Sequence, residues 1–346
     1  MTRHRFRAVV IMIATLALAA SCVKEEKDSS SGPRRYEATR EMMGTFVTIT
    51  VWANTPQQGA TAVDAAFEQI RQIELSMSDY NPDSELSKIN REAYDHPVAV
   101  SDKMLDVLKT ALLYAELSDG GFDISMRPLK RLWKSAGKSG EVPDDDTIKA
   151  VLASVGYRDI ELDEQAKTVR FLKPAMELDL GAIAKGYSAD LAVAELKRLG
   201  VPAALVNAGG NIAVMGTPPN VRAWRVGIQD PNKLDLRLQD VIHLTGGSVA
   251  TSGDYERFVE IGGKRFSHIF DPRTGRPVEH MSSVTVIAPD GITSDALSTT
   301  LSVMGPDAGL ALAAKLVGVD AMFIVAGPDG PTVIKSPGFD KYLQGE

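Results

Sequence analysis

The fold is signalled most clearly by the stretch Asp179-Leu-Gly-Ala-Ile-Ala-Lys-Gly-Tyr187. The apolar run at 175–180 predicts a buried strand that leads into it, and apolar residues at helical spacing over 187–199 predict an amphipathic helix after it. A small-residue turn between a strand and a helix presents backbone N–H groups that can hold phosphate. Because this turn also carries Asp179 and Lys185, it is a candidate binding site.

Hydrophobic periodicity predicts further elements on both sides of this turn. Helices are expected at 60–77, 84–90, 101–117, 144–155, 293–304 and 308–315. Strands are expected at 43–51, 203–206, 223–228, 247–251, 284–288 and 321–326, with a hairpin over 157–172. This irregular alternation predicts a mixed α/β (α+β) domain, with mixed sheets and flanking helices, to which a smaller lobe could belong.

The bulk properties limit the classes of function. A chain of 346 residues is long enough for one large domain or two smaller ones. Its net charge of −7 argues against nucleic acid as a main partner.

The N-terminus has the pattern of a secretion signal. Arg3, Arg5 and Arg7 precede an apolar segment at 8–20 that is too short to span a bilayer comfortably. Leu18-Ala-Ala-Ser-Cys22 then resembles a bacterial lipoprotein cleavage box, although its aliphatic residue lies one place early. Cys22 is the only cysteine, and a buried or incidental thiol is the alternative to lipid attachment.

These features predict a signal peptide at 1–21, a flexible tether at 22–35 and a folded domain at 36–346. Lipid on Cys22 would anchor the protein at the periplasmic face of a bacterial membrane without a membrane-spanning helix. The inner membrane is preferred over the outer one, although Val23 after the cysteine does not decide between them.

Three downstream motifs combine small, polar and charged residues. Asn207-Ala-Gly-Gly-Asn211 follows an apolar strand and is either a tight turn or a place where a ligand approaches the backbone. Ala250-Thr-Ser-Gly-Asp-Tyr-Glu-Arg257 is either a hairpin loop or part of a site. Ser267-His-Ile-Phe-Asp-Pro-Arg-Thr-Gly275 places His268 before an Asp-Pro turn, together with Asp271 and Arg273, which favours function over a structural histidine.

A fourth motif, Ser294-Asp-Ala-Leu-Ser-Thr299, opens a predicted helix. Asp295 and Thr299 are one turn apart and therefore share a helical face. A carboxylate and a hydroxyl on one face suit Mg²⁺, which prefers oxygen ligands. The same residues also suit capping of the helix by Ser294, with Asp295 favouring the helix dipole, and both functions can hold at once.

Taken together, these motifs resemble the ApbE family, the FAD:protein FMN transferases. The resemblance runs from about residue 40 to about residue 304. The matching stretches are Met43-Gly-Thr45, Met77-Ser-Asp-Tyr80 with Ser84-Glu-Leu-Ser-Lys-Ile-Asn90, Asp119-Gly-Gly-Phe-Asp123, 179–187, 207–211, Thr251-Ser-Gly253, 268–275 and 294–299. One departure is Ser118-Asp-Gly-Gly121, where the family often has Thr-Asp-Gly-Ala.

The resemblance implies an ApbE-like flavin transferase fold and transfer of FMN from FAD to a Thr hydroxyl of an acceptor flavoprotein, with release of AMP. It implies Mg²⁺ bound by the carbonyl of Ala182, by Asp295 and by Thr299, with Lys185 adding positive charge and His268 acting as general base. The residues implied to bind FAD are Met43, Tyr80, Asp119, Gly120, Gly121, Phe122, Asp179, Lys185, His268 and Ile269.

Two other functions stay open from the sequence. An FAD pyrophosphatase would use the same residues with water as the acceptor, but in the family an Asn at the position of Tyr80 accompanies hydrolysis and a Tyr accompanies transfer. A lipoprotein that binds FAD without catalysis would not need the metal pair together with His268.

Overall fold

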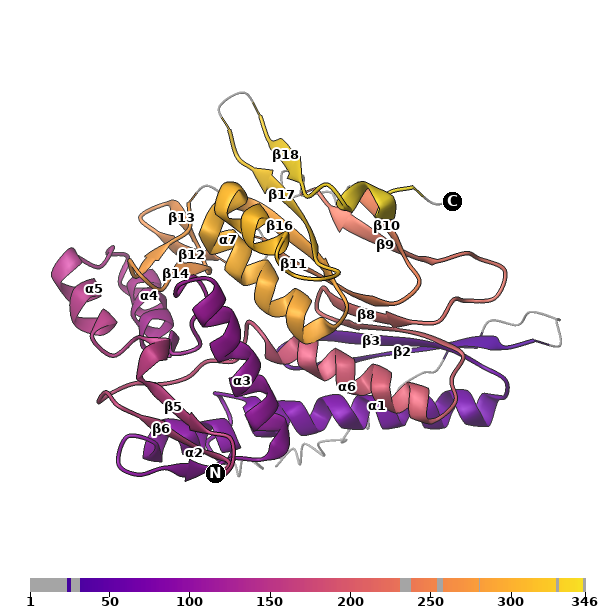
Figure 1. Ribbon diagram of the computed structural model, residues 1–346, viewed down its shortest axis with the longest axis horizontal. Helices are drawn as coiled ribbons and strands as arrows, with labels where there is room; N and C mark the ends of the chain where they lie inside the picture. The colour runs from indigo at the N-terminus through magenta and orange to yellow at the C-terminus, as the bar shows by residue number, and fades with distance from the viewer. Residues whose placement is uncertain are drawn as a thin grey trace, which may run out of the picture.

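The computed structural model describes residues 24–25, 32–230, 238–253, 258–279, 281–327 and 330–344. Figure 1 shows a large sheet covered by long helices, with a smaller helical lobe beside it. The sheet has the strand order β1-β2-β3-β7-β8-β11-β16-β17-β18, and neighbouring strands all pair antiparallel. Its strands are β1 (Lys24–Glu25), β2 (Arg34–Met42), β3 (Thr45–Ala53), β7 (Ala203–Ala208), β8 (Asn211–Met215), β11 (Gly247–Gly253), β16 (Met281–Ala288), β17 (Asp320–Val325) and β18 (Thr332–Lys335).

Three long helices cover one face of this sheet. The helix α1 (Pro56–Met77) begins at Thr55, whose hydroxyl accepts the Gln58 N–H, and buries its apolar stripe against the inward side chains of β3. The helices α6 (Ala184–Arg198) and α7 (Gly291–Ala313) pack beside it. The two helices expected at 293–304 and 308–315 form one element, α7, with a break at Gly305, where φ is 75° and the next residue is Pro306.

A hairpin covers part of the opposite face of the sheet. It consists of β9 (Trp224–Gln229) and β10 (Leu238–Leu244) and is antiparallel. Trp224, Val226 and Ile242 pack against Met322 of β17 and against Phe339, which begins the short helix η2 (Phe339–Tyr342). The sheet is therefore covered on both sides, as the burial of all eight residues of β16 requires.

The smaller lobe contains shorter elements packed against α7. Its helices are α2 (Glu85–Glu92), α3 (Asp102–Leu117), α4 (Arg127–Ser139), α5 (Asp145–Leu152) and η1 (Tyr157–Asp159). Its strands are β4 (Val98–Ala99), β5 (Ile160–Asp163), β6 (Thr168–Phe171), β12 (Phe258–Ile261), β13 (Lys264–Ser267), β14 (Phe270–Asp271) and β15 (Arg276–Pro277). One apolar core joins α3 and β6 to α6, α7 and β16, so the lobe continues the main core.

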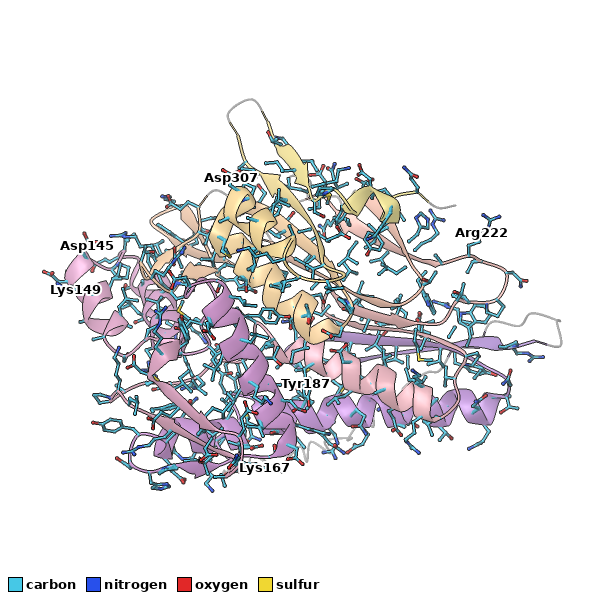
Figure 2. All side chains as sticks on the ribbon, in the orientation of Figure 1. Asp145, Lys149, Lys167, Tyr187, Arg222 and Asp307 are labelled. Atoms are coloured by element: carbon cyan, nitrogen blue, oxygen red, sulfur yellow. The ribbon has the colours of Figure 1, made fainter. Side chains whose placement is uncertain are left out.

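The helix α6 crosses the boundary between the sheet and the lobe. Figure 2 shows Tyr187 where α6 passes α3, and its hydroxyl donates to a carboxylate oxygen of Asp106 at 3.3 Å. Burial of the phenol, reinforced by the nearby charge of Asp106, raises the pKa of Tyr187 well above its usual range. The side chain therefore stays protonated and joins the two parts of the molecule.

The strand expected at 175–180 is not formed. Met176, Leu178 and Leu180 are buried at alternate positions, as an extended segment would place them, but only Glu177 makes a ladder contact, a parallel bridge to Met126. The alternation that predicted a strand comes from burial against the lobe instead of from strand pairing.

The start of the folded region also differs from the expected boundary at residue 36. The strand β2 begins at Arg34, and Lys24–Glu25, inside the expected tether, pair with Tyr36 and Glu37. The signal peptide at 1–21 and Cys22 lie outside the described residues. Among the described residues, no helix is long and apolar enough to cross a membrane.

Candidate active site

The turn before α6 is held by its own charged side chains. One carboxylate oxygen of Asp179 accepts the Gly181 N–H and the Lys130 ammonium, both at 2.8 Å. Burial alone would raise the pKa of Asp179, but the Lys130 charge and these hydrogen bonds outweigh it and hold the pKa below its usual value. Lys185 donates to the Gly181 carbonyl at 2.8 Å, so Asp179 and Lys185 meet at one turn.

Asp295 lies where the first turns of α6 and α7 meet. The residue is 4% exposed, and one carboxylate oxygen accepts the Gly186 N–H at 2.8 Å. The other oxygen is 3.7 Å from the Lys185 ammonium. Residue Ile183 at the start of α6 provides no capping side chain, so the carboxylate of Asp295 takes that place, and the helix dipole favours its negative charge.

Hydroxyl groups link α7 to β11. Ser252 lies 2.8 Å from the Ser298 hydroxyl and 3.4 Å from that of Thr299, and Ser248 lies 2.9 Å from Ser294. Of the motif at 250–257, residues 250–253 belong to β11, and 254–257 lie outside the described residues. Thr299 is therefore held one turn after Asp295, on the side of α7 that faces β11.

The three expected metal ligands supply the kind of donor atom that Mg²⁺ prefers. Asp295, Thr299 and the carbonyl of Ala182 are all oxygen donors, the class that Mg²⁺ prefers, and they lie on or next to the α6–α7 junction. The described residues contain no cluster of three or more His, Cys, Asp or Glu side chains that could hold a metal. A site built from one carboxylate, one hydroxyl and one carbonyl would leave positions for water and substrate phosphate, which is usual for Mg²⁺.

The helix α4, which the sequence reasoning missed, supplies cations to this region. Lys130 bonds to Asp179, Arg127 bonds to Glu177 and Asp79, and Lys134 lies 5.7 Å from the centre of the Tyr80 ring. Tyr80 itself is 83% exposed. The helix could have been found from Pro128 at its start, Gly140 at its end and apolar residues at 129, 133 and 136.

Two hairpin turns lie side by side where the strands β2, β3, β7 and β8 end. Met43 and Gly44 form the β2–β3 turn, both with positive φ, and the Met43 N–H donates to Glu74 at 2.6 Å. Asn207-Ala-Gly-Gly-Asn211 contains the β7–β8 turn, where Asn207 accepts the Gly210 N–H. A Cβ on Gly209 would lie 2.5 Å from the Thr45 hydroxyl, so this motif meets a packing requirement of the turn.

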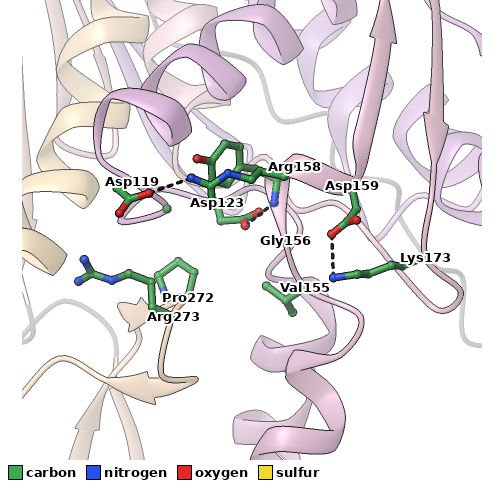
Figure 3. A pocket seen from close by; sticks show the side chains of 11 residues that line it. Asp119, Asp123, Val155, Gly156, Arg158, Asp159, Lys173, Pro272 and Arg273 are labelled. Carbon is green, nitrogen blue, oxygen red and sulfur yellow. Dashed lines mark hydrogen bonds and ion pairs between the residues drawn. The ribbon is translucent and has the colours of Figure 1, made fainter.

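A pocket of about 250 Å³ opens between three loops of the lobe (Figure 3). Asp119 and Gly120 line it with positive φ, and Asp119 pairs with Arg158 at 2.8 Å. Its lining combines charged and apolar residues: Asp119, Gly120, Asp123, Val155, Gly156, Tyr157, Arg158, Asp159, Lys173, Pro272 and Arg273. The contribution of residues 155–159 and Lys173 to this pocket was not predicted from the sequence.

The remaining residues of the Asp119 loop are internal supports. Phe122 is 2% exposed, and its N–H donates to the Ser118 hydroxyl at 2.9 Å. Asp123 accepts the N–H groups of Ser125 and Tyr157, while burial raises the pKa of its carboxyl group above the usual range. Gly121 faces Met304 of α7, since a Cβ there would lie 3.2 Å from the Met304 side chain.

His268 and Ile269 lie between β13 and β14. Ile269 is 6% exposed and donates its N–H to Ser267 at 3.1 Å, so the expected flavin residue is mainly buried. The loop after it is anchored, because Trp133 of α4 donates to the Gly275 carbonyl at 2.9 Å and Arg273 pairs with Asp271 at 2.8 Å. His268 therefore lies one short strand before the anchored 272–275 turn, of which Pro272 and Arg273 line the pocket.

The described contacts join the expected site residues into two groups. Asp179, Lys185, Asp295 and Thr299 form the first group, around the α6–α7 junction. The second is the Asp119–Gly120 turn, which lines the pocket together with Pro272 and Arg273 of the turn that follows His268 and β14. Two lysines of α4 lie next to Tyr80 and Asp179, respectively. The helix therefore links the first group to the exposed Tyr80 loop.

Comparisons with known proteins show which family this chain resembles. The family model described as the ApbE family matches residues 43–323. The curated FAD:protein FMN transferase of Treponema pallidum is 36% identical over 309 residues, and the match covers 84% of each chain. The crystal structure of the apbe protein of Thermotoga maritima superposes with a TM-score of 0.80 at 32% identity, covering 90% of this chain and 99% of that chain. The flavin transferase ApbE of Vibrio cholerae gives 0.79 at 32% identity, covering 90% and 100%.

Proposed function

The chain belongs to the ApbE family and is an FAD:protein FMN transferase, and we propose that its reaction depends on Mg²⁺ held by Asp295, Thr299 and the carbonyl of Ala182. The observation that carries this proposal is the buried carboxylate of Asp295. It is fixed by the Gly186 N–H, lies 3.7 Å from Lys185 and is one helical turn from the Thr299 hydroxyl.

In the proposed reaction, a Thr hydroxyl oxygen of the acceptor protein attacks the phosphorus of the FMN half of FAD. A phosphoester bond to Thr forms, the pyrophosphate bond to AMP breaks, and AMP leaves. Phosphoryl transfer depends mainly on alignment and charge neutralisation. Bound Mg²⁺ would neutralise pyrophosphate charge, and the Lys185 ammonium would add positive charge from the turn before α6.

We propose His268 as the general base that takes the proton of the Thr hydroxyl. Its neighbours Ser267 and Ile269 are buried, and the Ile269 N–H donates to the Ser267 hydroxyl, so the backbone that carries the ring is held in place. The base is needed because a Thr hydroxyl is a weak nucleophile near neutral pH.

The flavin contacts are proposed at the two groups of residues described above. Met43, Asp179 and Lys185 would contact FAD at the sheet edge and the α6 turn, and the exposed ring of Tyr80 is available for stacking. Asp119, Gly120, Gly121, Phe122, His268 and Ile269 would border it from the lobe. An acceptor flavoprotein with an exposed Thr is the implied protein partner.

The metal proposal is tested with Asp295→Ala. FAD, an acceptor flavoprotein domain and a series of Mg²⁺ concentrations are incubated with each protein, and attached FMN is measured by mass spectrometry and free FMN and AMP by chromatography. We expect transfer to fall at least about 100-fold, because even residues that only support metal ligands contribute 10–100-fold. Asp307→Ala, at an exposed position on the same helix (Figure 2), should transfer normally.

Near-normal transfer by Asp295→Ala at low Mg²⁺ would remove the metal assignment. Free FMN and AMP without attached FMN would instead indicate FAD hydrolysis. Bound FAD with neither product would indicate a binding protein.

We also propose that Cys22 carries lipid and holds the enzyme at the periplasmic face of a bacterial membrane, the inner one by preference. The arginine-rich start, the short apolar segment and the single cysteine support this proposal.

A further inference from the structure

In the helices α6 and α7, the first-turn N–H groups of each helix bond to a carboxylate of the other helix. Asp295 of α7 accepts the Gly186 N–H of α6 at 2.8 Å. In return, Asp190 of α6 accepts the N–H groups of Gly291 and Ile292 of α7 at 2.6 and 2.8 Å, one on each carboxylate oxygen. Each helix N-terminus is therefore capped by an acidic side chain of the other helix.

Two glycines allow the helices to approach closely enough for this exchange. A Cβ on Gly186 would lie 1.9 Å from the Gly291 carbonyl oxygen, and a Cβ on Gly291 would lie 2.4 Å from the Gly186 oxygen. The backbones are thus in direct contact, and neither residue can be replaced by alanine without moving a helix.

The α7 start also has a local cap that can be compared with Asp190. Asp290 accepts the Thr293 N–H at 3.0 Å, within its own helix. Asp190 and Asp290 therefore both satisfy first-turn N–H groups of α7, but only Asp190 joins α7 to α6. The position of Asp295 relative to Lys185 and Ala182 is set across that joint.

We propose that Asp190 is a positioning residue of the active site: by capping α7 from α6, it fixes the Asp295 carboxylate against the turn that carries Ala182 and Lys185. This inference rests on the proposed role of Asp295 as the metal ligand. Asp190 itself contacts neither metal nor substrate, so its removal should weaken metal binding and leave FAD binding without metal intact.

The test compares Asp190→Ala with Asp290→Ala in the full-length protein. Mn²⁺ alone is the metal probe, and its binding to the FAD-loaded protein is followed by electron paramagnetic resonance. FAD affinity without metal is measured by flavin fluorescence, and stability is measured by thermal melting.

For Asp190→Ala, we expect the Mn²⁺ dissociation constant to rise about 10-fold or more, the scale at which support residues affect metal sites. FAD affinity should stay within about twofold. Asp290→Ala should lower the melting temperature through the lost cap and leave Mn²⁺ binding within about twofold. Asp190→Asn, which keeps a single acceptor oxygen, should fall between wild type and Asp190→Ala and covers the case in which the alanine variant does not fold.

The variant Asp295→Ala distinguishes a failure of the positioning role of Asp190 from a failure of the metal assignment. If wild type binds Mn²⁺, Asp295→Ala does not and Asp190→Ala binds like wild type, the positioning role is overturned while the metal proposal stands. If Asp190→Ala and Asp290→Ala weaken Mn²⁺ binding equally, a general loss of α7 stability replaces the positioning role. If Asp295→Ala binds Mn²⁺ like wild type, the metal proposal and this inference fall together.

Discussion

At the scale of single residues, the proposed proton transfer depends on where the His268 imidazole is held. His268 lies between β13 and β14, flanked by the buried residues Ser267 and Ile269, and the Ile269 carbonyl accepts the Val278 N–H at 2.9 Å. That bracing gives a general base a defined direction of approach, which proton transfer requires.

We expect His268→Ala to lower the rate of FMN transfer by roughly 10²–10⁴-fold, the usual contribution of a positioned base. FAD affinity should change little, since most of the proposed FAD contacts are made by other residues. Transfer rate, FAD affinity and melting temperature are measured on the same protein. His243→Ala is the matched control, because His243 lies on β10 and contacts the Tyr342 carbonyl at 3.4 Å.

The control should lose some stability and keep its transfer rate. If His268→Ala folds and transfers FMN at the wild-type rate, the imidazole has no part in the reaction. A parallel loss of FAD affinity, stability and rate would instead identify a structural histidine.

The sequence predicted the helical placement of Asp295 and Thr299 but not the contacts around them. Asp295 and Thr299 were placed on one face of a helix from their spacing alone, and the structure places them there. Asp190 was not identified, because its partners, the N–H groups of Gly291 and Ile292, lie about 100 positions away. Spacing along a chain reveals contacts within one helix and none of those between two helices.

At the scale of elements, the junction of α6 and α7 concentrates negative charge. Asp290 and Asp295 lie at the start of α7, and the carboxylate of Asp190 reaches the same place from α6. Burial, together with the nearby charges of Asp290 and Asp295, raises the pKa of Asp190 to about 6, against the opposing effect of its two backbone hydrogen bonds.

A raised pKa means that the folded protein binds the Asp190 proton more tightly than the unfolded chain does. This contribution to stability is complete below pH about 4 and is lost as pH rises to about 6. In metal-free protein, wild type should therefore lose about 1–3 kcal/mol relative to Asp190→Asn over that range. Urea unfolding at several pH values measures both proteins, and parallel stability curves would contradict the raised pKa.

Helices and strands were predicted correctly where the apolar periodicity was accompanied by residues typical of the start or end of an element. The helix α1 was expected at 60–77 and spans Pro56–Met77, because its apolar stripe faces a sheet along its whole length. The helix α4 was missed although Pro128, Gly140 and its apolar spacing mark it, and strand β2 was missed because its apolar residues are few. The expected strand at 175–180 was wrong, since alternate burial occurs there without strand pairing.

At the scale of the whole molecule, the proposed lipid anchor decides where the enzyme works. Cys22 is two residues before β1, which pairs with β2 at the edge of the main sheet. Little free chain would therefore separate lipid on Cys22 from the folded region, and the sheet edge would be held near the membrane surface.

We expect Cys22→Ser to shift the protein from the membrane fraction to the soluble fraction, or to leave an uncleaved form of higher mass. The several acyl chains of a bacterial lipoprotein give stable attachment, whereas none remain without the cysteine. Fractionation followed by mass spectrometry measures both effects. Arg3→Gln alone should still be processed, and unchanged mass and fractionation of Cys22→Ser would exclude the anchor.

The mutual capping of α6 and α7 by carboxylates of the other helix has a kinetic consequence for folding. Its three hydrogen bonds join residues 101 to 109 positions apart. Contacts of such high sequence separation require closure of a long loop before they contribute any stability, which is slow compared with the formation of single helices. The active site should therefore be among the last parts of the protein to assemble, and a nascent chain that has not yet reached residue 295 has no functional centre to complete.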